Sequence, residues 1–306
     1  MQSFGNRRLE EDDDVFNENA WDQYEWTEEM EREAQNMIDL ASQEPLPAEK
    51  REHFLKNAAN FWDEFYDHHE SHFFKNRKWL TREFPELLDR SLASGPFRPS
   101  EHVDFPGQSS SFRVLEVGCG AGNTVTPILE AKERGVEDTF IYACDFSEKA
   151  VALVRSSYLY RPEHCLAFEQ DISKPNLTWP FPPGSIDVIC MIFVLSAISP
   201  ADFSQTICNL RDCLRPGGMI LFRDYGRFDM AQLRFKKGRC ISENFYTRGD
   251  GTCVYFFQQE EVRRLFTEAG LVEVENHMDR RLLVNRRRKL KMYRVWLQCR
   301  YQKPIE

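Results

Sequence analysis

The segment "LEVGCGAGN", residues 115–123, decides the fold expected for this chain. It continues an apolar run that begins at Phe112 and leads into a helical pattern, so we predict a buried strand, a tight turn and a helix. Gly118, Gly120 and Gly122 permit the turn and let the backbone approach a ligand at the helix start. A dinucleotide fingerprint would be G-x-G-x-x-G, whereas the third glycine here comes one residue early. This spacing suits a nucleoside ligand without a pyrophosphate better than a nicotinamide dinucleotide.

Four further apolar runs follow this turn, and helical or turn patterns separate them. They are the segments 139–145, 165–171, 185–195 and 217–225. Near the end of the chain, "KMYRVWLQCRY", 291–301, alternates apolar and polar residues with the period of a half-buried strand. Strands that alternate with helices predict an α/β fold, in which helices cover both faces of a mainly parallel sheet.

Two acidic residues end successive strands of this predicted sheet. Asp145 comes 23 residues after Gly122, where a carboxylate can accept both ribose hydroxyls of an adenosine. Asp171 ends the next strand, where an acid commonly faces the adenine amino group. Either aspartate could instead cap a helix, because Ser147 and Ser173 follow closely. The glycine turn and both acids belong to the carboxyl edge of the sheet, where such folds bind ligands.

The charge of the chain is unevenly distributed. Residues 1–50 carry 15 acidic and 4 basic side chains, whereas the rest carries 34 acidic and 36 basic ones. Basic residues also cluster in "DRRLLVNRRRKLK", 279–291. A local basic strip can bind an acidic partner even in an acidic protein, although it could equally be a solvated charged loop.

The cysteines and the N-terminal sequence bear on the compartment. Nine cysteines are scattered without a C-x-x-C pair, which in a chain this long is typical of reduced thiols in a cytosolic or nuclear protein. The longest apolar run, 188–198, is too short to span a bilayer. Residues 1–16 contain no apolar signal core, and their acidic run argues against a mitochondrial transit peptide. We therefore expect a cytoplasmic protein without a membrane segment.

The N-terminal third differs in pattern from the rest. We expect an acidic arm at 1–48, irregular apart from a helix near 27–42. Residues 49–73 are predicted to form one helix with an apolar stripe of Phe54, Ala58, Phe61 and Phe65. A helical and linker region then extends to residue 111, with Gly, Pro and Ser clusters over 91–111. The α/β domain spans 112–306 and contains an insertion at 226–257.

The ordered set of segments "VLEVGCGAGN", "ACDFS", "FEQDI" and "LRPGGMILFRDYG" resembles the class I S-adenosylmethionine-dependent methyltransferases. The likeness covers about 112–300. It implies a Rossmann-like sheet of seven strands, mostly parallel, with the last strand antiparallel and inserted beside the sixth. The segments "NAWDQYEW", "GRFDMAQLRF" and "ENFYTRGDGTCVYFF" further resemble enzymes that make 3-methylcytidine in the anticodon loop of tRNA, most closely a cytosolic member with an acidic N-terminal arm.

This resemblance implies a function and a set of site residues. It implies that S-adenosylmethionine is the methyl donor, that tRNA is the substrate, and that an aminoacyl-tRNA synthetase or an anticodon-binding adaptor could be a partner. It places Trp62 and Tyr66 of the N-terminal helix over the cofactor, although plain core packing would also explain this pair. The remaining cofactor contacts that it implies are Gly118, Gly120, Asp145, Asp171 and Ile192.

The segment "FWDEFYDHHESHFFKNRKWL", 61–80, is therefore expected to act as a lid. Its second half would present Lys75, Arg77 and Lys78 to phosphates, with aromatic side chains nearby for stacking on bases. His68 and His72 are also four residues apart, a spacing that a metal ion could use. No suitable third ligand lies nearby in the sequence, so we expect no metal site.

Methylation of cytosine N3 requires little acid–base catalysis from the protein. N3 is neutral with a free lone pair, so no general base is required, but the product is cationic and a nearby carboxylate would help. Asp224 in "FRDYG" is our candidate for this carboxylate, and a loop cap is the alternative. Within the insertion, "FYTRGDGTCVYFF" predicts a hairpin tipped by residues 249–251. We expect this hairpin, with Arg248, to line the substrate pocket.

Three other functions were weighed. A nicotinamide-dependent oxidoreductase fails on the glycine spacing. A methyltransferase acting on a protein or a small molecule is disfavoured by the basic residues at 75–78 and 279–291 but remains open. A catalytically silent RNA-binding subunit is disfavoured by the intact glycine turn with its acids. Binding of S-adenosylmethionine would distinguish this last alternative from an enzyme.

Overall fold

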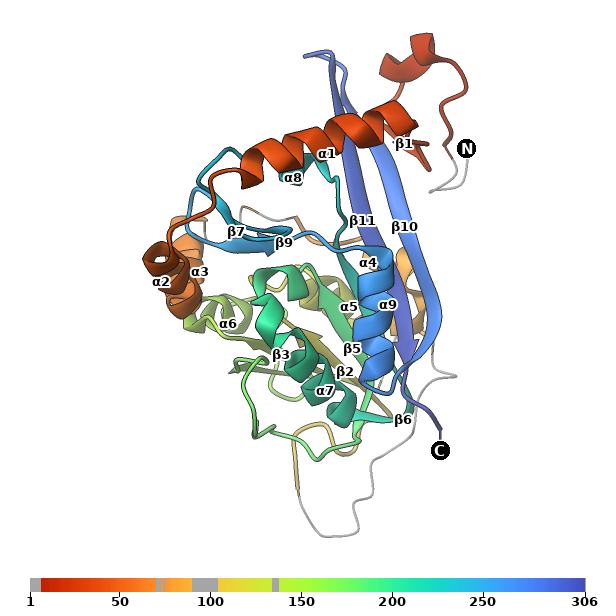
Figure 1. Cartoon of the computed structure of the whole chain (residues 1–306). Helices are drawn as coiled ribbons and strands as arrows, with labels where there is room; N and C mark the ends of the chain where they lie inside the picture. Colours follow the sequence, from red (N-terminus) through yellow and green to blue (C-terminus); the bar gives the residue numbers. More distant parts are fainter. Residues whose placement is uncertain (1–6, 70–72, 74, 90–103, 134–137, 306) are drawn as a thin grey trace.

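An eight-stranded sheet forms the centre of the molecule (Figure 1). The coordinates are a computed structural model, and they describe residues 7–69, 73, 75–89, 104–133 and 138–305. The strands lie in the order β1-β10-β11-β6-β5-β2-β3-β4. Their bounds are β1 Ala20–Asp22, β2 Phe112–Val117, β3 Thr139–Asp145, β4 Cys165–Glu169, β5 Ile186–Ile192, β6 Leu214–Tyr225, β10 Val272–Asn285 and β11 Leu290–Gln302.

The pairing confirms the predicted methyltransferase sheet. Strands β2 to β6 are mutually parallel, whereas β11 is inserted between β6 and β10 and runs antiparallel to both. The carboxyl ends of the parallel strands therefore share one edge. The eighth strand, β1, was not predicted. It comes from the acidic arm and is anchored by Trp21, which is buried with Val15, Leu282 and Val284.

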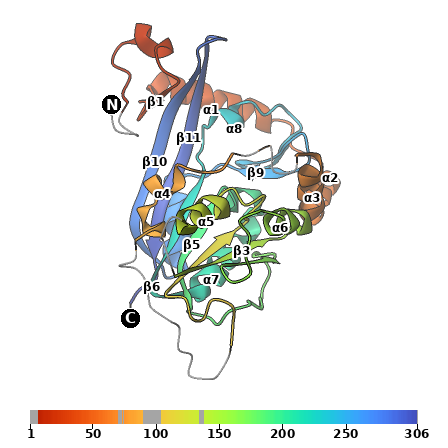
Figure 2. The same ribbon diagram turned by 180° about the vertical axis from the view of Figure 1, so that it is seen from behind.

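Helices cover both faces of the sheet. Helices α7 (Phe203–Cys213) and α9 (Gln259–Glu268) lie on the face seen in Figure 1, whereas α5 (Val125–Glu133) and α6 (Glu148–Arg155) lie on the face seen in Figure 2. Neighbouring strand residues point to opposite faces, so Leu115 packs with the first pair of helices and Val114 with the second. Each face thus has its own hydrophobic core.

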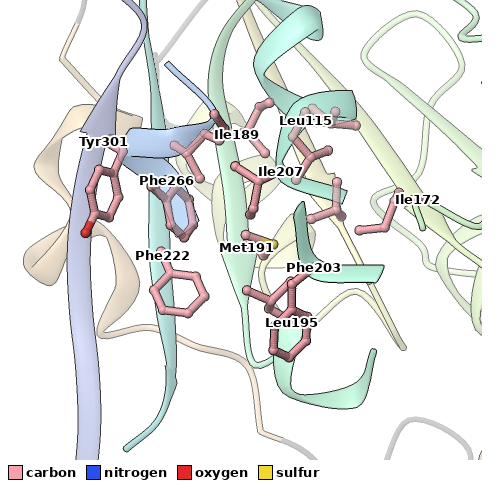
Figure 3. Packing of buried hydrophobic residues seen from close by; sticks show 14 of the residues in the cluster. Leu115, Ile172, Ile189, Met191, Leu195, Phe203, Ile207, Phe222, Phe266 and Tyr301 are labelled. Atoms are coloured by element: carbon pink, nitrogen blue, oxygen red, sulfur yellow. The ribbon is translucent and has the colours of Figure 1, made fainter. Parts of the chain in front are cut away.

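Aliphatic and aromatic side chains together fill the core beneath α7 and α9 (Figure 3). The rings of Phe266 and Tyr301 are stacked at 4.3 Å, and Phe222 meets Phe266 edge-on at 5.4 Å. These contacts join helix α9 to strands β6 and β11. They fix the antiparallel strand β11 against the parallel part of the sheet.

The N-terminal third contains α1 (Glu28–Ser42), α2 (Ala48–Lys56), α3 (Ala58–His69) and the single turn α4 (Leu80–Glu83). Helix α1 agrees with the helix predicted near 27–42. The single helix predicted over 49–73 is wrong, because the chain turns at Asn57. The Asn57 side-chain amide donates to the carbonyl of His53 at 2.8 Å and so ends α2 there. His72 and the greater part of the predicted linker lie outside the described residues.

The insertion 226–257 forms a layer of its own beside the sheet edge. It contains α8 (Met230–Leu233) and a small sheet of β7 (Cys240–Ser242), β8 (Phe245–Thr247) and β9 (Cys253–Tyr255). Strands β8 and β9 pair in antiparallel fashion, which confirms the predicted hairpin. Its tip is closed by a bond from the Arg248 amide to the Thr252 carbonyl at 2.8 Å.

The basic strip 279–291 divides into two parts. Arg280 forms an ion pair with Glu31, and Arg281 with Asp22, Glu83 and Asp279, so these two arginines hold the N-terminal elements on the sheet. The remaining basic residues are exposed around the turn of the long β10–β11 hairpin, which extends beyond the body of the molecule (Figures 1 and 2). No helix in the described ranges is long and apolar enough to cross a membrane.

Candidate active site

Two pockets meet at the carboxyl edge of the parallel strands. The first, which we call the Asp145 pocket, has a volume of about 270 Å³, and the second, the Arg248 pocket, about 450 Å³. Both are lined by the same group of residues at their common wall: Trp62, Tyr66, Gly118, Phe193 and Ala197. The two pockets are therefore adjacent, and ligands bound in both would lie on either side of these shared residues.

The glycine turn after β2 forms part of this wall. Gly118 has φ +57°, and a Cβ atom there would lie 2.6 Å from Val194 Cγ2. Gly120 has φ +52°, and a Cβ atom there would lie 2.6 Å from the Tyr66 hydroxyl. Both positions therefore require glycine for conformation and for space. The turn brings its backbone close to the Tyr66 side chain of α3.

Asp145 at the end of β3 is buried and its carboxylate is fixed by the backbone. It accepts hydrogen bonds from the amides of Gly120 at 2.9 Å and Ser147 at 3.0 Å. Burial raises the pKa of Asp145 to about 6, although these hydrogen bonds oppose the shift. The cap of helix α6 is Ser147, whose hydroxyl accepts from the Ala150 amide. Asp145 is thus not the cap of this helix, and it lines the Asp145 pocket.

Asp171, two residues after β4, lies on the same pocket. One carboxylate oxygen accepts from the amide and hydroxyl of Ser173 at 3.0 and 2.6 Å, and the other pairs with Lys174 at 3.3 Å. These bonds close a turn in which no helix begins. The two aspartates thus come from neighbouring strands and line one pocket, as expected for acids at the carboxyl edge.

Helix α3 covers this edge with two aromatic rings. Trp62 and Tyr66 are stacked with their ring centroids 5.8 Å apart, and both line both pockets. The helix is held in place by Asp63, which accepts a hydrogen bond from the Ser147 hydroxyl at 2.5 Å. Burial raises the pKa of Tyr66. The pair thus lines the common wall of the two pockets, and its role as a lid over a cofactor stays a prediction.

Ile192 is placed differently from the other expected cofactor residues. Its side chain is 2% exposed and packs in the core between the sheet and helices α5 and α6. The next two residues, Phe193 and Val194, line the Asp145 pocket instead. Phe193 has φ +60°, so the chain turns sharply directly after β5.

These features fit an adenosine group with a flexible extension. The turn offers backbone amides without side chains, two carboxylates line the pocket, and stacked aromatic rings cover it. Each carboxylate oxygen has two lone pairs, so Asp145 can still accept ribose hydroxyls beside its backbone bonds. The donors of S-adenosylmethionine and the acceptors of the Asp145 pocket therefore match. Within the described ranges, no group of histidine, cysteine and acidic residues could hold a metal ion.

The Arg248 pocket has a different chemistry. It is lined by aromatic side chains and by cations, and Asp250 is the only acid among its described lining residues. The aromatic residues are Trp62, Phe65, Tyr66, Phe73, Trp79, Phe193, Tyr225 and Trp296, and the cations are Lys75, Arg77, Arg248 and Arg294. Flat rings and positive charges together suit an unpaired nucleotide, which offers a base to stack and a phosphate to pair.

The predicted RNA-binding residues take up different positions around this pocket. Arg248, on the hairpin tip, donates to the Thr252 hydroxyl and lies over the Tyr225 ring at 5.8 Å. Lys75 is exposed on the lining, whereas Lys78 is exposed but does not line the pocket. Arg77 faces inward: it donates to Thr124 Oγ1 at 2.7 Å and pairs with buried Glu116 at 3.7 Å.

Arg77 and Glu116 are thus part of the floor of the Arg248 pocket and not of its outer surface. Burial raises the pKa of Glu116 to about 8 and lowers the pKa of Arg77, although each charge partly offsets the shift of the other. The predicted contact of Arg77 with a phosphate stays a prediction, and it would form from the pocket floor, where Arg77 already pairs with Glu116.

Asp224 lies behind the wall of the Arg248 pocket. It is fully buried, and its two oxygens accept from the amides of Ser196 at 2.9 Å and Tyr225 at 2.8 Å. Ser196 and Tyr225 both line the pocket, whereas Asp224 does not. Burial raises the pKa of Asp224 to about 6. Asp224 therefore fits the alternative interpretation, a loop cap, better than the role of a group that contacts a substrate.

Comparisons with known proteins show the family to which this chain belongs. A family model described as a methyltransferase domain matches residues 66–276. A Xenopus tropicalis protein named tRNA N(3)-cytidine methyltransferase METTL2 is 51% identical over 99% of this chain and 95% of its own length. The chain belongs to this family. The human tRNA N(3)-cytidine methyltransferase METTL2B is 43% identical over 99% of this chain and 94% of its own, and a Schizosaccharomyces pombe tRNA N(3)-methylcytidine methyltransferase, trm140, is 43% identical over 99% and 92%.

Sequence reasoning on this member of the tRNA N(3)-cytidine methyltransferase family did not single out several of the lining residues. Phe193 was counted as the end of an apolar strand, and nothing in that pattern signals its positive φ. Trp79 belongs to a segment whose aromatic side chains were expected to stack on bases, but it was not named individually. Arg294 was assigned to the polar half of a strand, and Trp296, two residues further on, to neither half; both line the pocket. Only the antiparallel register of β11 beside β6, which pairs Trp296 with Tyr225, brings them to the pocket.

Proposed function

We propose that this protein transfers a methyl group from S-adenosylmethionine to N3 of a cytidine in the anticodon loop of specific tRNAs. The single observation that carries the proposal is the common wall of the two pockets. An adenosine-type ligand in the Asp145 pocket and an unpaired base in the Arg248 pocket would meet at Gly118, Trp62 and Phe193. Near full-length similarity to tRNA N(3)-cytidine methyltransferases supports the choice of acceptor.

In the Asp145 pocket, Asp145 would accept the ribose hydroxyls and Asp171 would face the adenine. Gly118 and Gly120 would leave room for the amino-acid part of the ligand, and the rings of Trp62 and Tyr66 would exclude water. When bound, S-adenosylmethionine supplies an electrophilic methyl group. The main contribution of the protein is then alignment, because transfer needs the nucleophile directly behind the methyl carbon.

In the Arg248 pocket, the chain must hold a base that has left its stack. Cytosine N3 lies on the Watson–Crick edge and is hidden in a duplex, so a loop base suits this pocket. The aromatic lining provides surfaces on which such a base can stack. N3 needs no general base, and this agrees with a pocket whose described lining contains a single acid, Asp250.

Asp224 would act in this scheme by positioning Ser196 and Tyr225. Its carboxylate holds the amides of Ser196 and Tyr225, and both residues line the Arg248 pocket. In Asp224→Asn one of these buried amides loses its acceptor, which costs about 1–3 kcal/mol. We expect a higher KM for tRNA and unchanged affinity for S-adenosylhomocysteine. Full turnover with an unchanged KM would contradict any role for Asp224.

The compartment and the partners are part of the proposal. We propose that the protein works in the cytoplasm, where its reduced cysteines would be stable. We also propose that an aminoacyl-tRNA synthetase or an anticodon-binding adaptor presents the tRNA.

Two rival functions make different predictions. A methyltransferase for proteins or small molecules would use the Asp145 pocket but would not label tRNA. A silent RNA-binding subunit would bind tRNA but not S-adenosylmethionine. The cations and aromatic rings of the Arg248 pocket favour an RNA acceptor over the first rival, and the glycine turn with Asp145 favours catalysis over the second.

The test is to incubate the purified protein with methyl-labelled S-adenosylmethionine and bulk tRNA, digest the tRNA and identify the labelled nucleoside. We expect 3-methylcytidine. A parallel reaction receives a tRNA-free cell extract, and label that appears only there supports the proposed partner. Label in another nucleoside, or no labelled tRNA in either reaction despite cofactor binding, would overturn the proposed function.

A further inference from the structure

Indole and guanidinium groups alternate along one side of the Arg248 pocket, in the order Trp79, Arg223, Trp296 and Arg294. The Arg223 guanidinium carbon lies over the Trp79 ring at 5.2 Å and over the Trp296 ring at 4.8 Å. The Arg294 guanidinium carbon lies over the same Trp296 ring at 4.9 Å. Trp79, Trp296 and Arg294 line the pocket, whereas Arg223 does not. Of the two guanidinium groups in the series, only that of Arg294 therefore belongs to the pocket lining.

The two arginines use their donors differently. Arg223 is 4% exposed, and its terminal nitrogens donate to Asp279 at 2.6 Å and to Gln298. The Arg294 side chain is 21% exposed, and its Nε donates to Asp229 at 2.8 Å. Among the described residues, no acceptor meets the two terminal nitrogens of Arg294. Arg223 is thus satisfied within the fold, whereas Arg294 keeps charged donors for a ligand.

Asp229 fixes the orientation of Arg294. It is fully buried, and the oxygen that binds Arg294 Nε also accepts from the Val295 amide at 2.9 Å. Its other oxygen accepts from the Ala231 amide at 2.8 Å. The carboxylate cannot move without breaking backbone bonds. With Nε held by Asp229 and one face of the guanidinium against Trp296, the terminal nitrogens remain in a pre-organised position.

We propose that Arg294 binds a phosphate of the RNA segment whose base enters the Arg248 pocket, and that Asp229 is the positioning residue for this contact. The inference rests on the proposed function and names a contact within it. Two free donors in a planar fork match the oxygens of a phosphate bidentately. Partly buried charged donors without an acceptor are costly, and an anionic ligand removes that cost.

The test measures the affinity of the full-length protein for an anticodon stem-loop RNA at several salt concentrations, without methyl donor. In Arg294→Gln we expect about tenfold weaker binding at low salt and a slope of log K against log salt that is smaller by about 0.7–0.9, the loss of one phosphate contact. Arg294→Lys keeps the charge, so the slope should stay while affinity falls because the fork is lost. Arg264→Gln removes an exposed charge on α9 and should change neither quantity.

Asp229→Asn separates positioning from bulk charge. Removing a negative charge beside the pocket should strengthen RNA binding if only net charge matters. We expect weaker binding and a reduced slope instead, as in Arg294→Gln, with normal affinity for S-adenosylhomocysteine as the check on folding. If Asp229→Asn does not fold, the two Arg294 variants decide alone.

The outcomes are distinct. An unchanged slope in Arg294→Gln overturns the inference, and weaker binding with that unchanged slope would mean that Arg294 stacks on a base. If the wild-type protein binds the stem-loop but methylates no cytidine in tRNA, the proposed function fails. If it methylates cytidine and Arg294→Gln has a wild-type slope, only this inference fails.

Discussion

The Asp145 pocket and the Arg248 pocket share a wall but are built in different ways. The first uses backbone turns and carboxylates at successive strand ends, so its key residues occur at regular points of the sequence. The second collects rings and cations from α3, the end of β5, the insertion hairpin and β11, which are far apart in the chain. The residues of the first pocket can therefore be recognised from local sequence, whereas those of the second come together only in the fold.

The strongest way to test this comparison is to fill the space at the glycine turn. In Gly118→Ala the new Cβ would lie 2.6 Å from Val194 at a φ of +57°. We expect about 100-fold weaker binding of S-adenosylhomocysteine by calorimetry, because strain of this kind costs about 1–3 kcal/mol and the pocket narrows as well. Gly249→Ala, which meets no atom within 4 Å, is the matched control and should bind normally. Equal affinities would show that the turn does not contact the ligand.

The next largest effect should come from Asp145→Asn. The side chain would lose its charge. Its single amide oxygen could accept from the Gly120 amide or from the Ser147 amide, which now bond to different oxygens of Asp145. Hydrogen bonds to a charged acceptor contribute about 1.5–3 kcal/mol, so the affinity for S-adenosylhomocysteine should fall about 30-fold. Affinity for RNA should be unchanged, since Asp145 lines only the first pocket. A parallel loss of RNA binding would mean that the two pockets are not separate in function.

A substitution at the tip of the β8–β9 hairpin should displace helix α3 at the common wall of the two pockets. In Gly251→Ala, at φ +86°, the Cβ would lie 2.3 Å from Phe61 of helix α3. Since α3 also carries Trp62, we expect kcat/KM for tRNA to fall about tenfold through misplacement of both walls, at a strain of about 1–3 kcal/mol. Gly249→Ala serves again as the control. Wild-type kinetics in Gly251→Ala would show that the hairpin tip and the helix move independently.

The smallest effect should appear in the pH dependence of cofactor binding. Burial raises the pKa of Asp145 to about 6, so the carboxylate that we propose accepts the ribose hydroxyls becomes protonated as the pH falls through this value. Affinity for S-adenosylhomocysteine should therefore decrease about fourfold from pH 7.5 to 5.5. Asp145→Asn should have a flat profile over the same range. A flat wild-type profile, or affinity that rises at low pH, would contradict the assigned role.

The same contrast explains what the sequence could and could not predict. The glycine turn, Asp145 and Asp171 were identified because a strand end and a characteristic residue coincide at each of them. The antiparallel strand at 291–301 was found from its period of two. These signals are local, and the sheet then brings them together.

Positions that depend on side-chain direction were not predictable in this way. Arg77 stands among exposed basic residues in the sequence but turns inward to Thr124 and Glu116. Ile192 and Phe193 are neighbours, and only the turn after β5 shows which of them reaches the pocket. Arg294 gains its role from Asp229, which lies 65 residues earlier in the chain. Such contacts are properties of the packed fold.

The most direct test of the central claim changes one atom of the acceptor. A tRNA that the protein methylates is rebuilt with 3-deazacytidine at the labelled position, so that a C–H group replaces N3. We expect the protein to bind both tRNAs with equal affinity and to transfer the labelled methyl group only to the one with N3. Methyl transfer to the 3-deaza tRNA would contradict the account, because the methyl group would then be going to a different atom.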